Sequence, residues 1–403
     1  MNTAFAPPPG VAIVRQRALS VGILFWAVFL VLGFFGRDQF WRAYLIGYLF
    51  TTGIALGSLA LLMLQHLTGG GWGMVIRRVL EAATRTLPIM ALLFIPIIIG
   101  AHSLYPWADA HKVAESPALI EKARLFLNVK FFVVRAAVYF AIWLTLAFFF
   151  NKWSRAQDLT ADRQFSKKMR MLSGPGMLLF VMTVTFAAID WAMSLSPEWS
   201  STIYGLLFVA AWALSALAFV VAAMALLSKS EPMASVVAPL HFHDLGKLLL
   251  ALVMLWAYFA FSQYLIIWSG NLPEEIHWYL PRTRGGWGAT ALFVVILHFA
   301  LPFLFLLSRS FKRDPHKLVL VAGLILVMRV IDFIWLIEPN VSKEHFHIGW
   351  AHLVAPIAFG GLWLAAFAWQ LGKRPLMPVN DPDFPDVLEQ AHAHHHKEFV
   401  EES

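Results

Sequence analysis

Residues 202–227 read TIYGLLFVAAWALSALAFVVAAMALL and contain no charged side chain. An α-helix needs about 20 mostly apolar residues to cross the hydrocarbon core of a bilayer, and this stretch is long enough. A strand of a membrane barrel would instead alternate apolar and polar residues over about ten positions. The continuous apolar run therefore predicts a transmembrane α-helix.

The composition extends this prediction to the rest of the chain. Of 403 residues, 59% are hydrophobic and only 14% are charged, whereas about 25% of the residues of a soluble chain are charged. We therefore expect an all-α integral membrane protein with about ten transmembrane helices. The apolar runs place these helices at about residues 18–35, 41–64, 87–105, 131–150, 175–195, 202–227, 245–268, 287–307, 318–338 and 348–371.

The absence of cysteine and the positive charge exclude several classes of site. Without cysteine, this chain cannot itself bind an iron–sulfur cluster through thiolates, attach a c-type haem or form a disulfide. The net charge of +7 would suggest a nucleic-acid partner in a soluble protein, but here the cations lie in short loops between apolar runs, so no nucleic acid is expected. Gly69-Gly70-Gly71 follows a helix rather than a strand, which predicts a loop and not a nucleotide site.

Lysine and arginine predict the orientation. When the ten spans alternate in direction, most loop cations lie on the side of the N-terminus, and cytoplasmic loops are the ones enriched in these residues. We expect a cytoplasmic N-terminal segment (1–17), a membrane domain (18–371) and a cytoplasmic polar tail (372–403), with both termini inside. The first span is expected to be a retained helix rather than a signal peptide.

The polar tail carries a group of histidines. We interpret it as a solvated or partner-bound segment, with a weak metal site or a proton-collecting surface as the alternative. No metal site is expected in the membrane domain. The tail histidines are His392, His394, His395 and His396.

Two spans end with similar motifs. Ala188-Ile189-Asp190-Trp191 is followed by Pro197, and Val330-Ile331-Asp332-Phe333 is followed by Pro339. These are the fifth and the ninth span, so the similarity predicts two related four-helix bundles with the same direction in the membrane, flanked by outer helices. The predicted bundles cover residues 41–197 and 202–338. Chance similarity between apolar helices is the alternative.

Ionisable residues inside the spans are candidate functional residues, because an unpaired charge at membrane depth is costly. Arg135 and Asp190 have the same predicted depth, so we expect them to form a buried pair, either functional or only structural. Arg329 and Asp332 lie three residues apart on one helix face and can pair locally. His298, near the middle of its span, is either a packing residue or a proton relay, and it has no second histidine at its depth to bind a b-type haem.

The seventh span carries polar residues along its length. They predict a polar track, with proton uptake at the cytoplasmic end and passage towards the buried ionic residues. An alternative for Asp244 is a helix N-cap. The candidate residues are His241, His243, Asp244 and Lys247 for proton uptake, and Tyr258, Ser262 and Gln263 for the track. The candidates near the outer face are His102, Glu274, Glu275, Glu338 and His352.

Several segments resemble one membrane-protein family. Residues 186–205 (FAAIDWAMSLSPEWSSTIYG), 243–248 (HDLGKL) and 255–275 (LWAYFAFSQYLIIWSGNLPEE) resemble the shorter of the two polysulfide-reductase-like (NrfD-type) membrane subunits of bacterial alternative complex III. Residues 94–107 and 127–143 agree with this resemblance. In all, it extends over most of the chain, from about residue 20 to about residue 370.

The resemblance implies a role in respiratory electron transport. Complexes of this family oxidise quinol and pass electrons through iron–sulfur clusters and c-type haems that are bound by partner subunits. The resemblance implies that this chain has no covalently bound cofactor and that quinone or quinol is an optional ligand. The implied partners are a longer sister subunit, to which quinol oxidation is mainly attributed, an iron–sulfur subunit, multihaem and monohaem cytochromes c, small membrane subunits and, optionally, a terminal oxidase.

Residues and resemblance together predict a membrane subunit of a quinol:cytochrome c oxidoreductase, or of a quinol oxidoreductase with another electron acceptor, without a complete catalytic site of its own. We expect it to contribute a transmembrane proton pathway and, as an option, a quinone pocket towards the outer face, lined by Arg135, Asp190, Arg329 and Asp332. Two alternatives stay open. One is a stand-alone proton-coupled secondary transporter, and the other is a purely structural membrane anchor of the complex.

Overall fold

The structure, a computed structural model, describes residues 5–341, 346–385 and 388–389. Within these residues there are ten helical spans long and apolar enough to cross a membrane, and no β-strand. The chain is therefore an all-α integral membrane protein, as predicted. The spans are Gly10–Phe35, Gln39–Thr68, Gly71–Ile99, Val129–Thr160, Arg163–Leu195, Tyr204–Leu227, Pro239–Gly270, Gly285–Leu307, Pro315–Asn340 and Trp350–Leu371.

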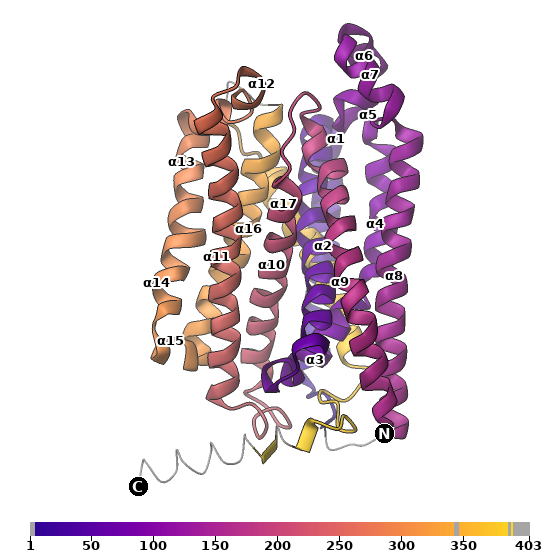
Figure 1. Cartoon of the computed structure of the whole chain (residues 1–403), viewed down its shortest axis with the longest axis vertical. Helices are drawn as coiled ribbons and strands as arrows, with labels where there is room; N and C mark the ends of the chain where they lie inside the picture. Colours follow the sequence, from indigo (N-terminus) through magenta and orange to yellow (C-terminus); the bar gives the residue numbers. More distant parts are fainter. Residues whose placement is uncertain (1–4, 342–345, 386–387, 390–403) are drawn as a thin grey trace.

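Most spans form one long helix, since helices satisfy their own backbone hydrogen bonds in lipid. Figure 1 shows the helices running roughly side by side along the long axis of the molecule. The longer ones are α1 (Gly10–Phe35), α2 (Arg37–Thr68), α8 (Val129–Thr160), α9 (Arg163–Trp191), α10 (Tyr204–Leu227), α11 (Pro239–Gly270), α16 (Pro315–Ile337) and α17 (Trp350–Leu371). The shorter ones are α3 (Gly71–Thr84), α4 (Leu87–Ile99), α5 (Ala101–Leu104), α6 (Ala110–Glu115), α7 (Pro117–Leu125), α12 (Pro273–Ile276), α13 (Gly285–Phe293), α14 (Leu301–Leu307) and α15 (Arg309–Arg313).

Several helices extend beyond the apolar runs because polar residues cap their starts. The Asn128 side chain accepts a hydrogen bond from the backbone N–H of Phe131 at 2.9 Å and so begins α8. Asp162 begins α9 in the same way, and Asp314 begins α16. Such caps satisfy backbone donors that the first turn of a helix leaves without partners.

The third span differs from its prediction. It begins at Gly71 rather than near residue 87, and it consists of α3 followed by α4. The charged residues of α3 looked like part of a loop, but in the structure they are buried and paired. The predicted glycine loop is present at Gly69 and Gly70, which have φ values of 69° and 94°, whereas Gly71 already belongs to α3.

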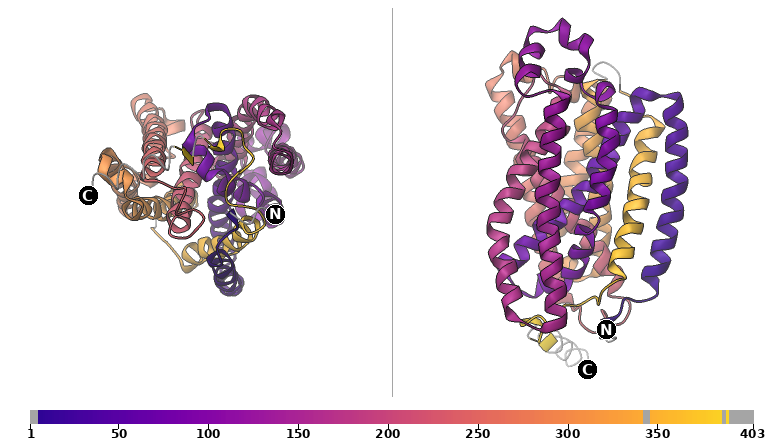
Figure 2. Two further views of the ribbon diagram at one scale, coloured as in Figure 1. Left: turned by 90° about the horizontal axis from the view of Figure 1, so that it is seen from below. Right: turned by 90° about the vertical axis from the view of Figure 1, so that its right-hand side faces the viewer.

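The spans form two groups around a central pair of helices. One group contains α2, α3, α4, α8 and α9, and the other contains α10, α11, α13, α14 and α16, with α2 packed against α10 between them. The most apolar window of α2 is 94% buried, whereas that of α1 is only 17% buried. The flanking helices α1 and α17 pack against each other at one edge of the molecule (Figure 2).

Both ends of the membrane domain lie at the same end of the molecule. We call this end, where α1 begins and α17 ends, the lower face, and the opposite end, with α5 to α7 and α12, the upper face (Figure 1). An even number of spans brings the two ends together in this way. The predicted cytoplasmic side corresponds to the lower face.

Small residues allow α17 to approach α1 closely. A Cβ atom on Gly361 would lie 2.6 Å from the Cα of Gly22 and 2.7 Å from its backbone nitrogen. We expect Gly361→Ala to separate the two helices and lower the unfolding free energy by about 2 kcal/mol, measured by thermal unfolding in detergent. Gly360→Ala is the control, because a Cβ there meets nothing within 4 Å. Equal losses in the two variants would contradict the prediction.

The eighth span contains an irregular turn. Between α13 and α14, residues Val294–Ala300 form a π-helical segment. Pro302 has no backbone N–H to donate to the carbonyl of residue 298, four residues earlier, which weakens regular α-helical bonding there. Segments of this kind often occur at functional sites, and this one contains His298.

Candidate functional site

Buried ion pairs form four groups in the part of the chain that the structure describes. The α8–α9 cluster is Arg135, Tyr139 and Asp190, and the α16 cluster is His298, Arg329 and Asp332. The upper cluster is Arg42, Glu338 and His352. The lower network is centred on Glu81 and is described below.

The α8–α9 cluster confirms the predicted pairing of Arg135 with Asp190. The guanidinium donates from Nε to Oδ2 at 2.8 Å and from Nη2 to Oδ1 at 2.7 Å, which is a bidentate ion pair. The hydroxyl of Tyr139 donates to Asp190 Oδ2 at 2.8 Å. The guanidinium also donates to the carbonyl of Phe126 and lies 3.9 Å from the centre of its ring. With three donors on the carboxylate, this cluster is well suited to hold α8 and α9 together.

The α16 cluster confirms the predicted local pair and adds a histidine. Arg329 donates from Nη1 to Asp332 Oδ2 at 2.6 Å, and its Nη2 lies 2.7 Å from His298 Nε2. Arginine can only donate, so Nε2 is the acceptor and the imidazole is neutral with its proton on Nδ1. Among the described residues, that Nδ1 has no hydrogen-bond partner. His298 is fully buried and lies edge-on to Trp256.

The structure places the two clusters apart. Helix α10 packs against α9 on one side and against α16 on the other, and no hydrogen bond or ion pair between described residues joins Arg135 or Asp190 to Arg329 or Asp332. The four residues that were predicted to line one quinone pocket therefore form two separate sites, one in each group of helices. Each aspartate lies buried near the upper end of its helix and binds an arginine, but Arg135 belongs to the neighbouring helix α8 whereas Arg329 belongs to α16 itself. The predicted repeat stays a prediction.

The predicted track along α11 is not continuous inside the protein. Tyr258 is 64% exposed and points away from the interior, and Ser262 is half-buried. Gln263 is buried, where its Oε1 accepts from Ser201 Oγ at 3.1 Å and its Nε2 donates to the hydroxyl of Tyr279 at 3.2 Å. Gln263 therefore joins α11 to the upper face, not to the ionic clusters.

The residues predicted for proton uptake lie at the lower end of α11. Lys247 pairs with Asp244 at 3.1 Å, and His243 Nδ1 lies 3.8 Å from the same carboxylate oxygen. The prediction of Asp244 as an N-cap is wrong, because α11 begins upstream at Pro239, a residue that suits the first helical position. The buried His241 accepts from the backbone N–H of Ala238 at 3.0 Å and helps to cap that start.

The outer-face candidates divide into surface and buried residues. Glu274 is exposed and Glu275 is half-buried. His102 is also exposed, and its Nδ1 atom lies 2.5 Å from the carbonyl oxygen of Ala108. Glu338 and His352 are fully buried inside the molecule. They form the upper cluster, in which His352 Nε2 lies 2.6 Å from Glu338 Oε1 and Arg42 Nε donates to the same oxygen at 3.0 Å.

The upper cluster joins three separate segments. Arg42 belongs to α2, Glu338 follows α16 and His352 lies in the first turn of α17. Arg42 was not among the predicted site residues, because a cation at the very start of a span resembles a residue of the preceding loop. Its position inside the start of an apolar run was the only available signal.

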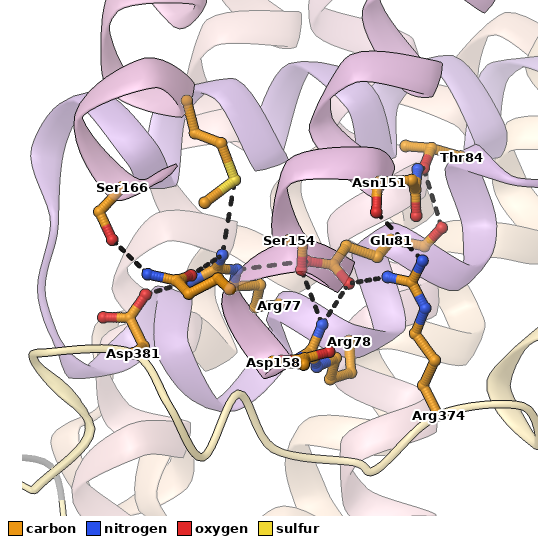
Figure 3. Close-up of polar contacts among 12 residues, drawn as sticks. Arg77, Arg78, Glu81, Thr84, Asn151, Ser154, Asp158, Ser166, Arg374 and Asp381 are labelled. Atoms are coloured by element: carbon orange, nitrogen blue, oxygen red, sulfur yellow. Dashed lines mark hydrogen bonds and ion pairs between the residues drawn. The ribbon is translucent and has the colours of Figure 1, made fainter. Parts of the chain in front are cut away.

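The lower network also went unpredicted (Figure 3). The buried Glu81 carboxylate accepts from Arg78 Nη1 at 2.7 Å, from Arg77 Nε at 3.2 Å and from Ser154 Oγ at 2.6 Å. Arg374, beyond the end of α17, approaches the same carboxylate at 3.4 Å. The spacing of Arg77 and Arg78 relative to Glu81, four and three residues, was the signal that could have indicated these pairs.

The network extends to α8 and to the segment after α17. Arg77 Nη1 donates to Asp381 at 2.5 Å, and Arg78 pairs with Asp158. Asn380 donates to the carbonyl of Asp158 at 2.6 Å. The segment after α17 therefore contacts α3 through Arg374 and Asp381 and contacts α8 through Asn380. Figure 3 shows Arg374 and Asp381 beside Arg77, Arg78 and Glu81. The part of the predicted tail that contains its four histidines lies outside the described residues.

Two cavities open near the upper face. The smaller, of about 190 Å³, lies where the similar motifs end, and both Pro197 and Pro339 line it. There Ser196 Oγ donates to Asn340 Oδ1 at 2.6 Å. The larger, of about 380 Å³, is lined by Gln263 and Glu275 among others. Within the described ranges, no group of three or more His, Asp or Glu side chains is placed to hold a metal ion.

No protein-family model matches the chain, and no curated protein gives a significant match.

Proposed function

We propose that this chain is a membrane subunit of a quinol:cytochrome c oxidoreductase of the alternative complex III type, in a bacterial inner membrane with the lower face towards the cytoplasm. The resemblance of residues 186–205, 243–248 and 255–275 supports the family. In this proposal iron–sulfur and cytochrome c partners carry the electrons, since a chain without cysteine holds no thiolate-bound cluster.

Within such a complex, we assign the α16 cluster to proton transfer. The observation that carries this role is His298, which is neutral, fully buried, bound to Arg329 through Nε2 and without a partner on Nδ1. An imidazole changes charge within the physiological pH range more readily than any other side chain. Ionisable groups inside a membrane bundle commonly mark ion or proton pathways.

A structural anchor is the second candidate function, and the α8–α9 cluster favours it. The Asp190 carboxylate accepts three hydrogen bonds from Arg135 and Tyr139, so it has little capacity left to exchange a proton. In this second function the α8–α9 cluster stabilises the packing of the first group of helices, and the chain serves to hold the complex in the membrane.

The test uses the intact complex. The tagged chain, purified in mild detergent from its native membranes, should bring with it c-type cytochromes and an iron–sulfur protein. In that complex, reconstituted into vesicles, His298→Gln should reduce at least about tenfold the protons moved across the membrane in excess of the one proton per electron that quinol oxidation itself releases. Quinol oxidation is retained because partners hold the redox centres. Glutamine can still accept from Arg329 but cannot carry a proton.

His102→Gln is the matched control, because it removes an exposed histidine and should change neither quantity. An unchanged proton yield in an assembled His298→Gln complex would exclude the α16 cluster as the proton route. A chain that purifies alone and without colour would argue against membership of a redox complex.

A further inference from the structure

The larger cavity has an apolar wall that faces the membrane. It lies between the upper ends of α9 and α11, at the level where those two spans end. Its wall is formed by Ile189, Met193, Ile203, Ile266 and Ile267. Ile266 is 55% exposed on the outer surface of the helices, so the cavity borders the lipid-facing side of the molecule. This wall suits an alkyl chain that enters from the bilayer.

The opposite side of the cavity is polar and firmly held. Gln263 is only 2% exposed and is bonded on both sides of its amide, to Ser201 and to Tyr279. Burial raises the pKa of Tyr279 to about 12, although its bond with Gln263 acts in the opposite direction, so the phenol stays protonated at neutral pH. Among the described residues, no side-chain hydrogen bond occupies the hydroxyls of Ser200 and Thr202, which also line the cavity.

The charge at the cavity is negative. Glu275 lines it, and within the described part of the chain no hydrogen bond or ion pair engages this carboxylate. The lining contains no lysine or arginine. A lone carboxylate attracts a cationic group and repels an anionic one. An anionic lipid head group is therefore disfavoured at this site.

We propose that this cavity binds a zwitterionic phospholipid with a primary ammonium head group. The ammonium pairs with Glu275, the phosphate and ester oxygens accept from Ser200 and Thr202, and the first part of an acyl chain lies on the isoleucine wall. The volume of about 380 Å³ lies within the usual range of ligand pockets. It accommodates a head group and the start of one chain, while the remaining carbons stay in the bilayer.

The experiment is native mass spectrometry of the full chain in micelles that contain equal amounts of phosphatidylethanolamine and phosphatidylglycerol with identical acyl chains. We expect the wild type to retain phosphatidylethanolamine in excess. Glu275→Gln should reduce that excess about tenfold, because a charge-assisted hydrogen bond is lost. Phosphatidylcholine, which has the charge but no N–H donor, should be retained less well than phosphatidylethanolamine.

Glu274→Gln provides the matched control, since Glu274 is the adjacent carboxylate and does not line the cavity. It should leave the preference unchanged. The proposal is overturned if Glu275→Gln keeps the full excess, if Glu274→Gln loses as much, or if a short-chain quinol displaces the bound lipid one for one. This test needs neither partners nor turnover, so its failure is distinguishable from failure of the proposed function.

Discussion

Replacing Arg329 with leucine should lower the unfolding free energy by about 3–5 kcal/mol. The fully buried guanidinium donates to Asp332 at 2.6 Å and to His298 at 2.7 Å. Leucine supplies apolar bulk but no charge, so the variant leaves a buried carboxylate without its cation. Protonation of Asp332 limits the loss, because a neutral acid is easier to bury. Thermal unfolding of the purified chain in detergent at neutral pH measures the difference.

The double variant Arg329→Leu/Asp332→Leu separates charge from packing. It should recover most of the lost stability, since removing both partners leaves no unpaired charge. Lys247→Leu is the surface control, because Lys247 is 56% exposed in its pair with Asp244 and should change stability by less than about 1 kcal/mol. A double variant no more stable than the single one would show that the unpaired carboxylate is not the cause.

The second large effect is expected for Glu81→Gln, again about 3–5 kcal/mol. Its carboxylate is 1% exposed and is shared by Arg77 and Arg78, with Arg374 at 3.4 Å. Glutamine keeps the shape but removes the charge that these guanidinium groups surround. We therefore expect residues 374–385 to loosen from α3 and α8, which thermal unfolding together with amide hydrogen exchange of that segment would detect.

Asp158→Asn is the control for this prediction. Asp158 also binds Arg78, but its side chain is 22% exposed, so water can replace part of what is lost. A change of about 1 kcal/mol is expected, with little additional exchange in residues 374–385. If both variants destabilise the chain equally, or if the exchange of the segment does not respond to Glu81→Gln, then Glu81 is not the centre of the lower network.

The sequence predicted contacts correctly where a contact depends only on spacing along one helix or on equal depth in the membrane. Arg329 and Asp332 were paired correctly because residues three apart share a helix face. Arg135 and Asp190 were paired correctly because each helical residue advances by about 1.5 Å, so positions in neighbouring spans can be compared by depth. These inferences require no knowledge of how the helices are arranged around one another.

The predictions were wrong where a contact depends on which helices pack side by side and on which of their faces meet. Nothing in the spacing of α11 indicates that Tyr258 faces outwards while Gln263 faces inwards, because a mostly apolar helix has no distinct polar face to orient it. The predicted common lining of Asp190 and Asp332 failed for a related reason. Equal depth does not imply contact when another helix, here α10, lies between the two residues.

Charged segments at the ends of spans were the other source of error. Arg77 and Arg78 were counted among loop cations, although they are 1% exposed inside the molecule. Charge alone predicts solvent exposure, and only partners from distant segments make burial possible. Those partners, Asp158 on α8 and Asp381 after α17, lie far away in the sequence.

The sequence by itself determined that this chain is a helical membrane protein, with ten spans in the residues that the structure describes. The length of an apolar run is a local property, and the thickness of the bilayer selects it. The sequence also determined the local ion pair of α16. Only the tertiary structure decided that His298 meets Arg329, that His352 meets Glu338 and that residues 374–385 close the lower network. Such contacts join segments far apart in the chain, and they depend on which helix faces pack together, which apolar composition does not specify.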